Sequence, residues 1–128
     1  MIVKRSLRKE IIEIPYTKEN VEKYKSPENL LSKAMTGDDI SGIMLIEKES
    51  GELIGYIAWK GNYIVALEVI SEYRGLGYGK ELLKKAISKG CKKLAVNKNN
   101  TRAIELYKKF GFRDNKIDYG PETIEMEI

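Results

Sequence analysis

The sequence predicts an α/β fold, of the α+β kind, in which helices flank a mixed central sheet. Three short apolar runs separated by tight turns occupy residues 43–70, and this spacing is typical of antiparallel strands. From residue 78 onward, helical and strand-like segments alternate, which is typical of parallel pairing. The chain has 128 residues, enough for one domain with its own core. We therefore expect a single domain over residues 1–128.

The three apolar runs predict an antiparallel meander. Ile43–Ile46 is a compact apolar run, whereas Leu53–Trp59 and Tyr63–Ile70 are rich in β-branched and aromatic residues. Turn-forming residues at Glu49–Glu52 and Lys60–Asn62 separate the runs. Because these connections are short, neighbouring strands are expected to run antiparallel.

Two amphipathic helices follow the meander. Over Tyr78–Lys89 the apolar side chains fall on one stripe, and Gly90 is suited to the end of the helix. Asn100–Phe110 has the same periodicity and is followed by Gly111. A strand predicted at Lys93–Val96 lies between the helices. Strand, helix and strand therefore form a right-handed crossover that joins a parallel pair.

The two ends of the chain add further elements. Glu10–Ile14 is predicted as a strand ended by a proline, with Thr17 as the N-cap of a short helix. A second helix is predicted over Ser26–Met35, with proline at its first position. Near the C-terminus, Phe112 begins another strand. Apolar residues alternate with glutamates over Ile124–Ile128, which is the period of a half-exposed strand.

The residue counts exclude several kinds of chemistry. The chain has no histidine and one cysteine, so Ser-His-Asp and Cys-His catalysis lack their base, and no disulfide forms within the chain. A zinc site loses its usual ligands, and no metal is expected. Cys91 is expected to be a small buried residue at the start of a strand.

The charge of the chain is mildly basic. Lysine and arginine number 23 against 19 aspartate and glutamate, and the net charge of +4 suits a polyanionic small ligand or a mixed, solvated surface. A nucleic-acid-binding domain is a weaker alternative, because the lysines are scattered and form no stripe interleaved with aromatic residues. No apolar run is long enough to span a membrane, and the charged start lacks the apolar stretch of a secretory signal. We therefore expect a cytoplasmic protein without a membrane partner.

A glycine-rich loop, Tyr73–Lys80, lies between the meander and the first long helix. Three glycines in five residues allow a tight turn and close approach to a ligand, and the N–H groups at a helix N-terminus attract anions. Two common nucleotide motifs do not fit. A Walker A loop needs glycine where Arg74 stands and a hydroxyl residue where Glu81 stands, and a Rossmann fingerprint needs one more residue between its last two glycines.

The segment Arg74-Gly-Leu-Gly77-Tyr-Gly79 matches the pattern R/Q-x-x-G-x-G/A and resembles the pyrophosphate loop of the GNAT superfamily of N-acetyltransferases. The preceding residues from Leu67 resemble the same family. The resemblance implies an acetyl-CoA site in which the loop amides hold the pyrophosphate and the strand before the loop meets the pantetheine arm. The loop and strand residues implied in binding are Leu67, Val69, Arg74, Gly75, Leu76, Gly77, Tyr78, Gly79 and Lys80. A glycine-rich turn that only caps a helix is the structural alternative.

A second segment, Asn100–Phe112, resembles the family pattern N-x-x-A-x-x-x-Y-x-x-x-G-F. The resemblance implies that Asn100 touches the pantetheine or orders the strands, and that Ala103 lets the cofactor lie close to the helix. It also implies that Tyr107 contacts the cofactor and is the general acid. Each residue has a structural alternative, since Asn100 can be an N-cap and Tyr107 a core aromatic. The resemblance covers residues 42–112 well and the N-terminal third hardly at all.

Acetyl transfer needs a base for the amine and a proton donor for the departing thiolate. Tyr107 is the expected donor, because a phenol with a pKa of about 10 is protonated at neutral pH. Some family members that modify protein N-termini carry a glutamate at the position of Ala95, so that base is absent here. Glu68 is the remaining candidate for the base, and both ordered water and a solvated sheet-face role for Glu68 stay open. A backbone N–H near Val69 is expected to hold the oxyanion.

The expected function is transfer of an acetyl group from acetyl-CoA to a primary amine in a ternary complex. The alternative is a non-catalytic acyl-CoA-binding sensor or regulatory module of the same fold. The acceptor stays open between a small molecule and a protein amine, because residues 15–42, which set it in this fold, carry no motif. Tyr56, Trp59 and Tyr63 either line an acceptor pocket or pack in the sheet. The oligomeric state is also open, with a homodimer among the alternatives.

Overall fold

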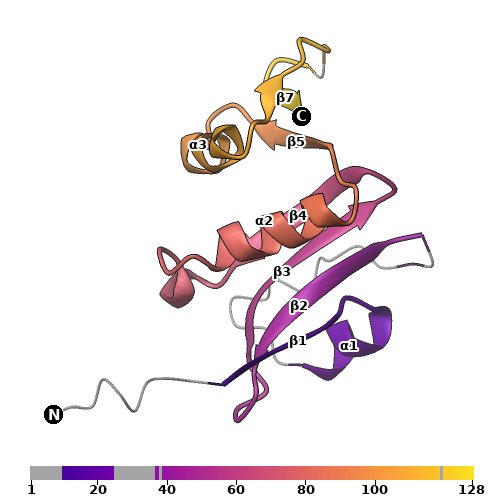
Figure 1. Cartoon of the computed structure of the whole chain (residues 1–128), viewed down its shortest axis with the longest axis vertical. Coiled ribbons are helices and arrows are strands. Elements are labelled where there is room, and N and C mark those ends of the chain that lie inside the picture. Colours follow the sequence, from indigo (N-terminus) through magenta and orange to yellow (C-terminus); the bar gives the residue numbers. More distant parts are fainter. Residues whose placement is uncertain (1–9, 25–36, 38, 119) are drawn as a thin grey trace, which may run out of the picture.

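The structure, a computed structural model, describes residues 10–24, 37, 39–118 and 120–128. Its centre is a 7-stranded mixed sheet with the order β1-β2-β3-β4-β5-β7-β6 (Figure 1), which confirms the predicted fold class. The strands are β1 Ile11–Pro15, β2 Ser41–Glu47, β3 Leu53–Lys60, β4 Tyr63–Val69, β5 Lys93–Asn97, β6 Arg113–Asp114 and β7 Thr123–Glu127. The helices are α1 Lys18–Lys23, α2 Tyr78–Ser88 and α3 Thr101–Lys109, with a 3-10 turn at Ser71–Tyr73 after β4.

Four antiparallel strands form the N-terminal part of the sheet. β2, β3 and β4 form the predicted meander, in which Ile57 of β3 lies opposite Ile43 on one side and Leu67 on the other. β1 extends the meander by one strand, because it pairs antiparallel with β2. Thr17 caps α1 as predicted, since its hydroxyl oxygen accepts a hydrogen bond of 3.1 Å from the Asn20 N–H.

β4 and β5 form the predicted parallel pair, but the pairing between the two strands is short. Tyr63 lies opposite Lys93, and Ile64 lies opposite Leu94. β5 then continues in antiparallel pairing with β7, while β4 continues with β3. Figure 1 shows β5, β7 and α3 set apart from the antiparallel strands β1–β4. The sheet therefore opens beyond Ile64 and Leu94, and one edge of the later part of β4 faces this opening.

The two faces of the sheet carry two separate cores. One core lies under α2 and α3 and contains Ile57, Leu82 and Phe112. The other lies on the side of α1 and contains Tyr16 and Tyr56. Because successive residues of a strand point to opposite faces, the neighbours Tyr56 and Ile57 belong to different cores. We call these the helix-side core and the α1-side core.

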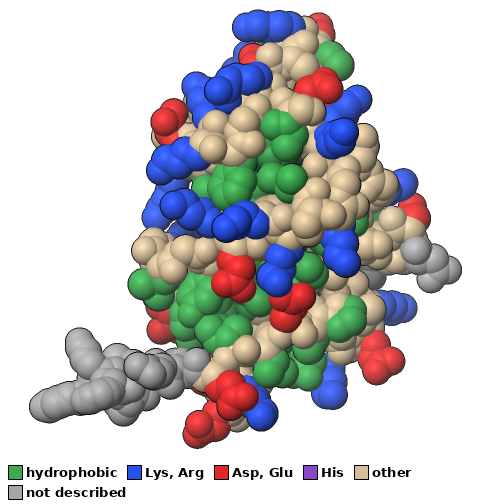
Figure 2. All heavy atoms as spheres, viewed as in Figure 1, with side chains coloured by type: hydrophobic (Ala, Val, Ile, Leu, Met, Phe, Trp, Pro, Cys, Tyr) green, Lys and Arg blue, Asp and Glu red, His purple; other side chains and the backbone are tan. Residues whose placement is uncertain are grey.

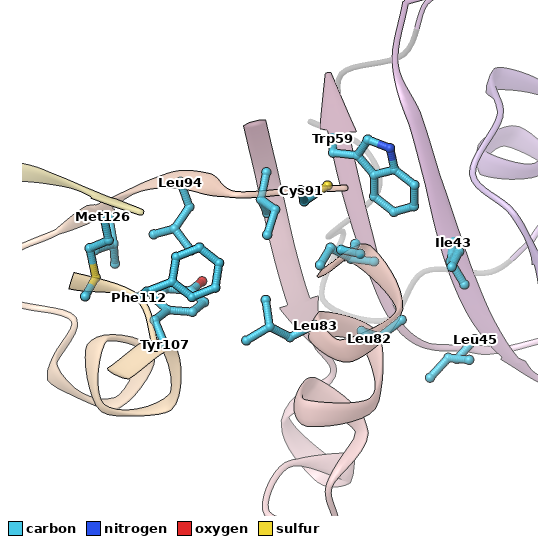
Figure 3. Close-up of a cluster of buried hydrophobic side chains, with 14 of the residues drawn as sticks. Ile43, Leu45, Trp59, Leu82, Leu83, Cys91, Leu94, Tyr107, Phe112 and Met126 are labelled. Atoms are coloured by element: carbon cyan, nitrogen blue, oxygen red, sulfur yellow. The ribbon is translucent and has the colours of Figure 1, made fainter. Parts of the chain in front are cut away.

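The helix-side core spans the opening of the sheet. Figure 3 shows one group of side chains that consists of Tyr107, Phe112, Leu94 and Met126, and a second group around Trp59, Ile43, Leu45 and Leu82. Helix α2 connects the two groups, because Leu82 and Leu83 on it are fully buried. Cys91 is buried in the same core, as predicted, and burial raises the pKa of its thiol to about 11.

The predictions for the two ends of the chain have different outcomes. The helix predicted over Ser26–Met35 lies outside the described residues. The C-terminal strand forms as β7, but the half-exposed pattern is wrong at Glu125, which is 5% exposed. The Tyr63 hydroxyl and the Asn115 side-chain amide donate hydrogen bonds to the Glu125 carboxylate. These two donors offset the cost of burying the charge.

Gly42 occupies the position where the antiparallel strands leave least room. An added Cβ would overlap the Ile57 carbonyl oxygen and would lie 2.9 Å from the Tyr16 Cβ. We expect Gly42→Ala to lower the free energy of unfolding by about 1–3 kcal/mol, because the backbone must shift to relieve the overlap. Chemical denaturation measures this change, with Ser41→Ala at the exposed neighbouring position as the control. Equal stabilities of the two variants would contradict the close contact of β2 with β3.

Candidate functional site

The predicted phosphate loop joins the 3-10 turn after β4 to the start of α2. Gly75 and Gly77 have left-handed backbone angles, with φ of +79° and +94°, and Gly77 is the N-cap of α2. Residues with a Cβ rarely adopt these angles, so the loop needs glycine at both positions. Arg74 and Leu76 are exposed, Leu76 to 66%. The N–H groups of the first helical turn have no acceptor within the helix, so this exposed terminus attracts an anion.

The Arg74 side chain folds back onto the strand that precedes the loop. Its Nε donates a hydrogen bond of 3.0 Å to the Val69 carbonyl oxygen. Val69 is the last residue of β4, so the bond fastens the loop to the end of that strand. The guanidinium keeps its positive charge next to the loop. Arg74 therefore holds the loop against the end of β4 and adds a positive charge at the edge of the loop.

A groove of about 510 Å³ lies between α2 and α3, next to the loop. It is lined by Gly77, Lys80, Glu81, Lys84, Lys109 and Phe110. Lys80 and Lys84 lie one turn apart on α2, and Lys109 is the last residue of α3. Figure 2 shows Lys and Arg side chains gathered over this part of the surface. Three ammonium groups beside an exposed helix N-terminus favour a ligand with several negative charges.

Asn100 and Ala103 lie together at the start of α3. The Asn100 side-chain oxygen accepts a hydrogen bond of 3.2 Å from the Ala103 N–H, so Asn100 is the N-cap of the helix. The structural alternative for Asn100 is thereby confirmed, and a cofactor contact stays a prediction. Ala103 is half-buried against the helix-side core.

Tyr107 lies in the helix-side core and is 7% exposed. Its ring packs edge-on against Phe112, with ring centroids 6.0 Å apart. Burial, and after it the negative charge of Glu68, raise the pKa of the Tyr107 phenol to about 12. Tyr107 is on α3 and Glu68 is on β4, so this charge acts across the opening of the sheet. The phenol is protonated at neutral pH and can donate a proton.

Glu68 lies on the sheet face turned away from α2 and α3. Its register partner on β3 is Tyr56, and cross-strand partners share a face. Tyr16 stacks on Tyr56, with ring centroids 5.3 Å apart and an interplanar angle of 19°. Burial and then the charge of Glu68 raise the pKa of Tyr56, whereas burial and then Tyr56 raise the pKa of Tyr16 to about 12. Glu68 is half-buried beside these tyrosines.

The three sheet aromatics considered for an acceptor pocket do not share one face. Trp59 is buried in the helix-side core, whereas Tyr56 belongs to the α1-side core. The hydroxyl of Tyr63 donates a hydrogen bond of 3.1 Å to Glu125. A single pocket lined by all three rings is therefore excluded, and Trp59 has the packing role.

Three charged residues beside these features were not predicted from the sequence: Lys84, Lys109 and Glu125. Lys84 follows Lys80 by one helical turn, and this spacing is the signal that identifies it. Lys109 joins the groove because α3 packs near α2, and Glu125 is enclosed because β7 pairs with β5. No local pattern in the sequence signals either of these two arrangements.

Within the ranges that the structure describes, no group of three or more His, Cys, Asp or Glu side chains could hold a metal ion. No helix in those ranges is both long enough and apolar enough to cross a membrane. The polar groups at the opening of the sheet are instead tyrosines, carboxylates and backbone groups. These groups can bind an anion at the loop and move protons near Tyr107 and Glu68.

The mixed sheet opens between two parallel strands, and a glycine loop lies at the start of the crossover helix. This arrangement is that of an acetyltransferase fold. Residues 6–112 match the model of the Acetyltransferase (GNAT) family, and the chain belongs to this family.

Relatives with known names are similar to part of the chain. Thialysine N-epsilon-acetyltransferase of Bos taurus is 43% identical over a match that covers 46% of this chain and 39% of the relative. An N-alpha-acetyltransferase of Sulfurisphaera tokodaii is 32% identical over 56% of this chain and 57% of the relative. The chain therefore spans less than two thirds of the length of these relatives.

Solved structures resemble the chain over most of its length. Arabidopsis thaliana NAA60 in complex with a bisubstrate analogue has a TM-score of 0.69 at 20% identity, over 91% of this chain and 97% of that chain. The same protein in complex with acetyl-CoA has a TM-score of 0.66 at 18% identity, over 93% and 98%. At these identities the likeness establishes the fold.

Proposed function

We propose that this chain is a single-domain N-acetyltransferase that moves an acetyl group from acetyl-CoA to a primary amine by direct attack in a ternary complex. One observation carries the proposal: the pairing of β4 and β5 ends at Ile64 and Leu94, and the glycine loop begins just beyond the far end of the same β4 strand. A linear arm can lie along β4 while its phosphates reach the loop. Family membership and the names of the relatives support the same activity.

The loop and the groove fit the phosphate end of CoA. The amides from Gly75 to Lys80 would hold the pyrophosphate at the start of α2, with Arg74 at the rim. Lys84 and Lys109 would face the phosphate on the ribose from the walls of the groove. The exposed Leu76 and the half-buried Tyr78 would cover the nucleotide from the loop.

The pantetheine arm would run along the open edge of β4. Beyond Ile64, the backbone groups of β4 that point away from β3 no longer meet β5, so Leu67 and Val69 can bond to the amides of the arm. Small residues leave room on the helix side. An added Cβ at Gly79 would lie 3.9 Å from Val69 Cγ2, and Ala103 is half-buried at the start of α3 beside its N-cap Asn100.

Acetyl-CoA supplies an acetyl thioester whose carbonyl carbon accepts the amine. Tyr107 gives a proton to the departing sulfur, and a backbone N–H on the open edge of β4 stabilises the oxyanion. Burial, and after it the charge of Glu68, raise the pKa of Tyr107 to about 12. The phenol therefore holds its proton at neutral pH until the thiolate departs.

Glu68 is one candidate acceptor of the amine proton, directly or through ordered water. It is half-buried, and its charge raises the pKa of Tyr56 and of Tyr107. Because Glu68 shares its face with the α1-side core, the amine approaches from that face. The phosphate groove, lined by α2 and α3, lies on the opposite side of the sheet.

The groove lysines provide a test of cofactor binding. We expect the double variant Lys84→Ala, Lys109→Ala to bind acetyl-CoA roughly 5–30-fold more weakly, because two exposed contacts of about 0.5–1 kcal/mol each are lost. Isothermal titration measures the Kd, and the loss should shrink at high salt. The double variant Lys18→Ala, Lys92→Ala removes the same charge from exposed positions outside the groove. An equal Kd for the two double variants would exclude a phosphate contact in the groove.

Tyr107→Phe tests the transfer itself. The change keeps the ring and its packing on Phe112, so the Kd for acetyl-CoA should change little. It removes the proton that the thiolate needs, and kcat should fall by about 10²–10⁴-fold. Free thiol release measures turnover with a panel of thialysine, lysine, spermidine and a peptide with a free N-terminus.

Two other outcomes of this panel would contradict the proposal. If the wild-type protein binds acetyl-CoA but acetylates none of the amines, it is a binding module of the same fold. If Tyr107→Phe lowers the melting temperature but leaves kcat unchanged, the hydroxyl has only a structural role.

A further inference from the structure

A tyrosine and a buried carboxylate form a hydrogen-bonded pair on the sheet face turned away from α2 and α3. The Tyr63 hydroxyl donates a hydrogen bond of 3.1 Å to Oε1 of Glu125, and the Asn115 amide donates one to Oε2. Glu125 is 5% exposed, whereas Tyr63 is half-buried. The carboxylate is therefore nearly closed off from solvent, and the half-buried phenol is one of the two groups bonded to it.

The register places this pair at the point where the two parallel strands part. Tyr63 and Ile64 belong to the last pairs that β4 makes with β5, and Ala95 is the first residue of β5 beyond them. Ala95 lies directly opposite Glu125 of β7. Cross-strand partners share a face, so Tyr63, Ala95 and Glu125 all lie on the face turned away from α2 and α3.

This position is the deepest point of the opening. An arm that lies between the diverging strands can reach no further than the Ile64–Leu94 pair, where the strands close. Its reactive end therefore arrives beside the Tyr63–Glu125 pair. Ala95 is exposed and small, so the surface next to the pair has room for a substrate group. β7 thus supplies a carboxylate where β5 has none.

We propose that Tyr63 and Glu125, rather than Glu68, form the proton relay for the acceptor amine, an inference that rests on the proposed acetyltransferase function. The ammonium form of the acceptor gives a proton to the Tyr63 oxygen while the Tyr63 hydroxyl proton passes to Glu125 Oε1. The N–H bond breaks, an O–H bond forms on Glu125, and the freed electron pair attacks the acetyl carbon. Tyr63 is the group that touches the amine, and Glu125 acts through it.

The remaining protons balance through solvent. The C–S bond breaks as the carbonyl re-forms, and the sulfur takes a proton from Tyr107. The second proton on nitrogen leaves to water, water restores Tyr107, and Glu125 releases its proton after the product departs. The sum is one ammonium and one acetyl thioester converted to one amide, one thiol and one proton.

The charged groups around the relay come from all three strands. Lys93 of β5 is the register partner of both Tyr63 and Glu127, so its charge lies on the same face. Asn115 also donates a hydrogen bond of 2.8 Å to Glu127, which links that carboxylate to Glu125. Glu68 lies further along β4 on this face. Glu68 and Glu125 are thus two carboxylates at different depths of the opening, and their variants can be compared.

Glu125→Gln tests the relay. Glutamine keeps the size of the side chain, but its one amide oxygen can accept from only one of the two donors, Tyr63 and Asn115, and the side chain can no longer take a proton. We expect kcat with the amine panel to fall by about 10²–10⁴-fold near neutral pH. The residual rate should rise with pH, because more of the amine is then already neutral. The Kd for acetyl-CoA should be unchanged.

The matched control is Glu127→Gln, which alters a carboxylate on the same strand and face that is also bonded to Asn115. It should keep the wild-type rate and pH profile. Tyr63→Phe removes the hydroxyl at the half-buried end of the relay. This variant replaces Glu125→Gln in the test if Glu125→Gln folds poorly. Because the two residues act in series, the double variant should lose no more than either single variant.

The outcomes separate the relay from the function on which it rests. No turnover by the wild-type protein with any amine of the panel would overturn both. Wild-type turnover together with an unchanged rate and pH profile in Glu125→Gln and Tyr63→Phe would overturn the relay alone. A lower melting temperature in Glu125→Gln without a changed pH profile would assign the pair a structural role and would also overturn the relay.

Discussion

The early end of the pairing between β4 and β5 is the constraint on which the rest of the structure depends. Beyond Ile64 and Leu94, each strand keeps its outer partner but loses the other. Backbone groups left inside a protein need hydrogen-bond partners, so the opening has to be filled by water or by a ligand with amides of its own. Helix α2 makes this arrangement stable, because Leu82 and Leu83 pack under the two halves of the sheet. The opening between β4 and β5 is thus part of the fold, and the glycine loop lies at its outer end.

Lysines predominate on one side of this opening, where Glu81 also lies, and carboxylates predominate on the other, where Lys93 also lies. Lysines from α2 and α3 line the groove next to the loop, where an anionic cofactor would be attracted. Glu68 and Glu125 lie on the other face, where they would attract a cationic amine and receive its proton. Tyr107 is packed in the helix-side core, where burial and then the charge of Glu68 raise its pKa. In the proposed reaction, the sheet would therefore separate the two substrates until they meet where the strands part.

Local patterns in the sequence predict the helices and strands well. They predict less well which helices and strands pack or pair with one another. The periodicity of residues 78–89 and 100–110 predicts α2 and α3, and the residue types at Thr17 and Asn100 predict their roles as N-caps. The crossover predicts a parallel pair, but the length of that pair depends on how α2 and α3 pack. The burial of Glu125 is likewise hidden, because a glutamate that alternates with apolar residues is typical of a solvated strand face. Such features depend on which strands become neighbours, and that information is not local.

Hydrogen–deuterium exchange with and without CoA measures most directly whether the opened strand is the cofactor site. At saturating CoA, peptides that cover residues 65–69 and 74–81 should exchange more slowly, because the arm bonds to the free edge of β4 and the pyrophosphate bonds to the loop. Peptides from β1 and β2, which lie away from the opening, should exchange at the same rate in both conditions. If bound CoA protects neither 65–69 nor 74–81, the opening between β4 and β5 is not where the cofactor lies.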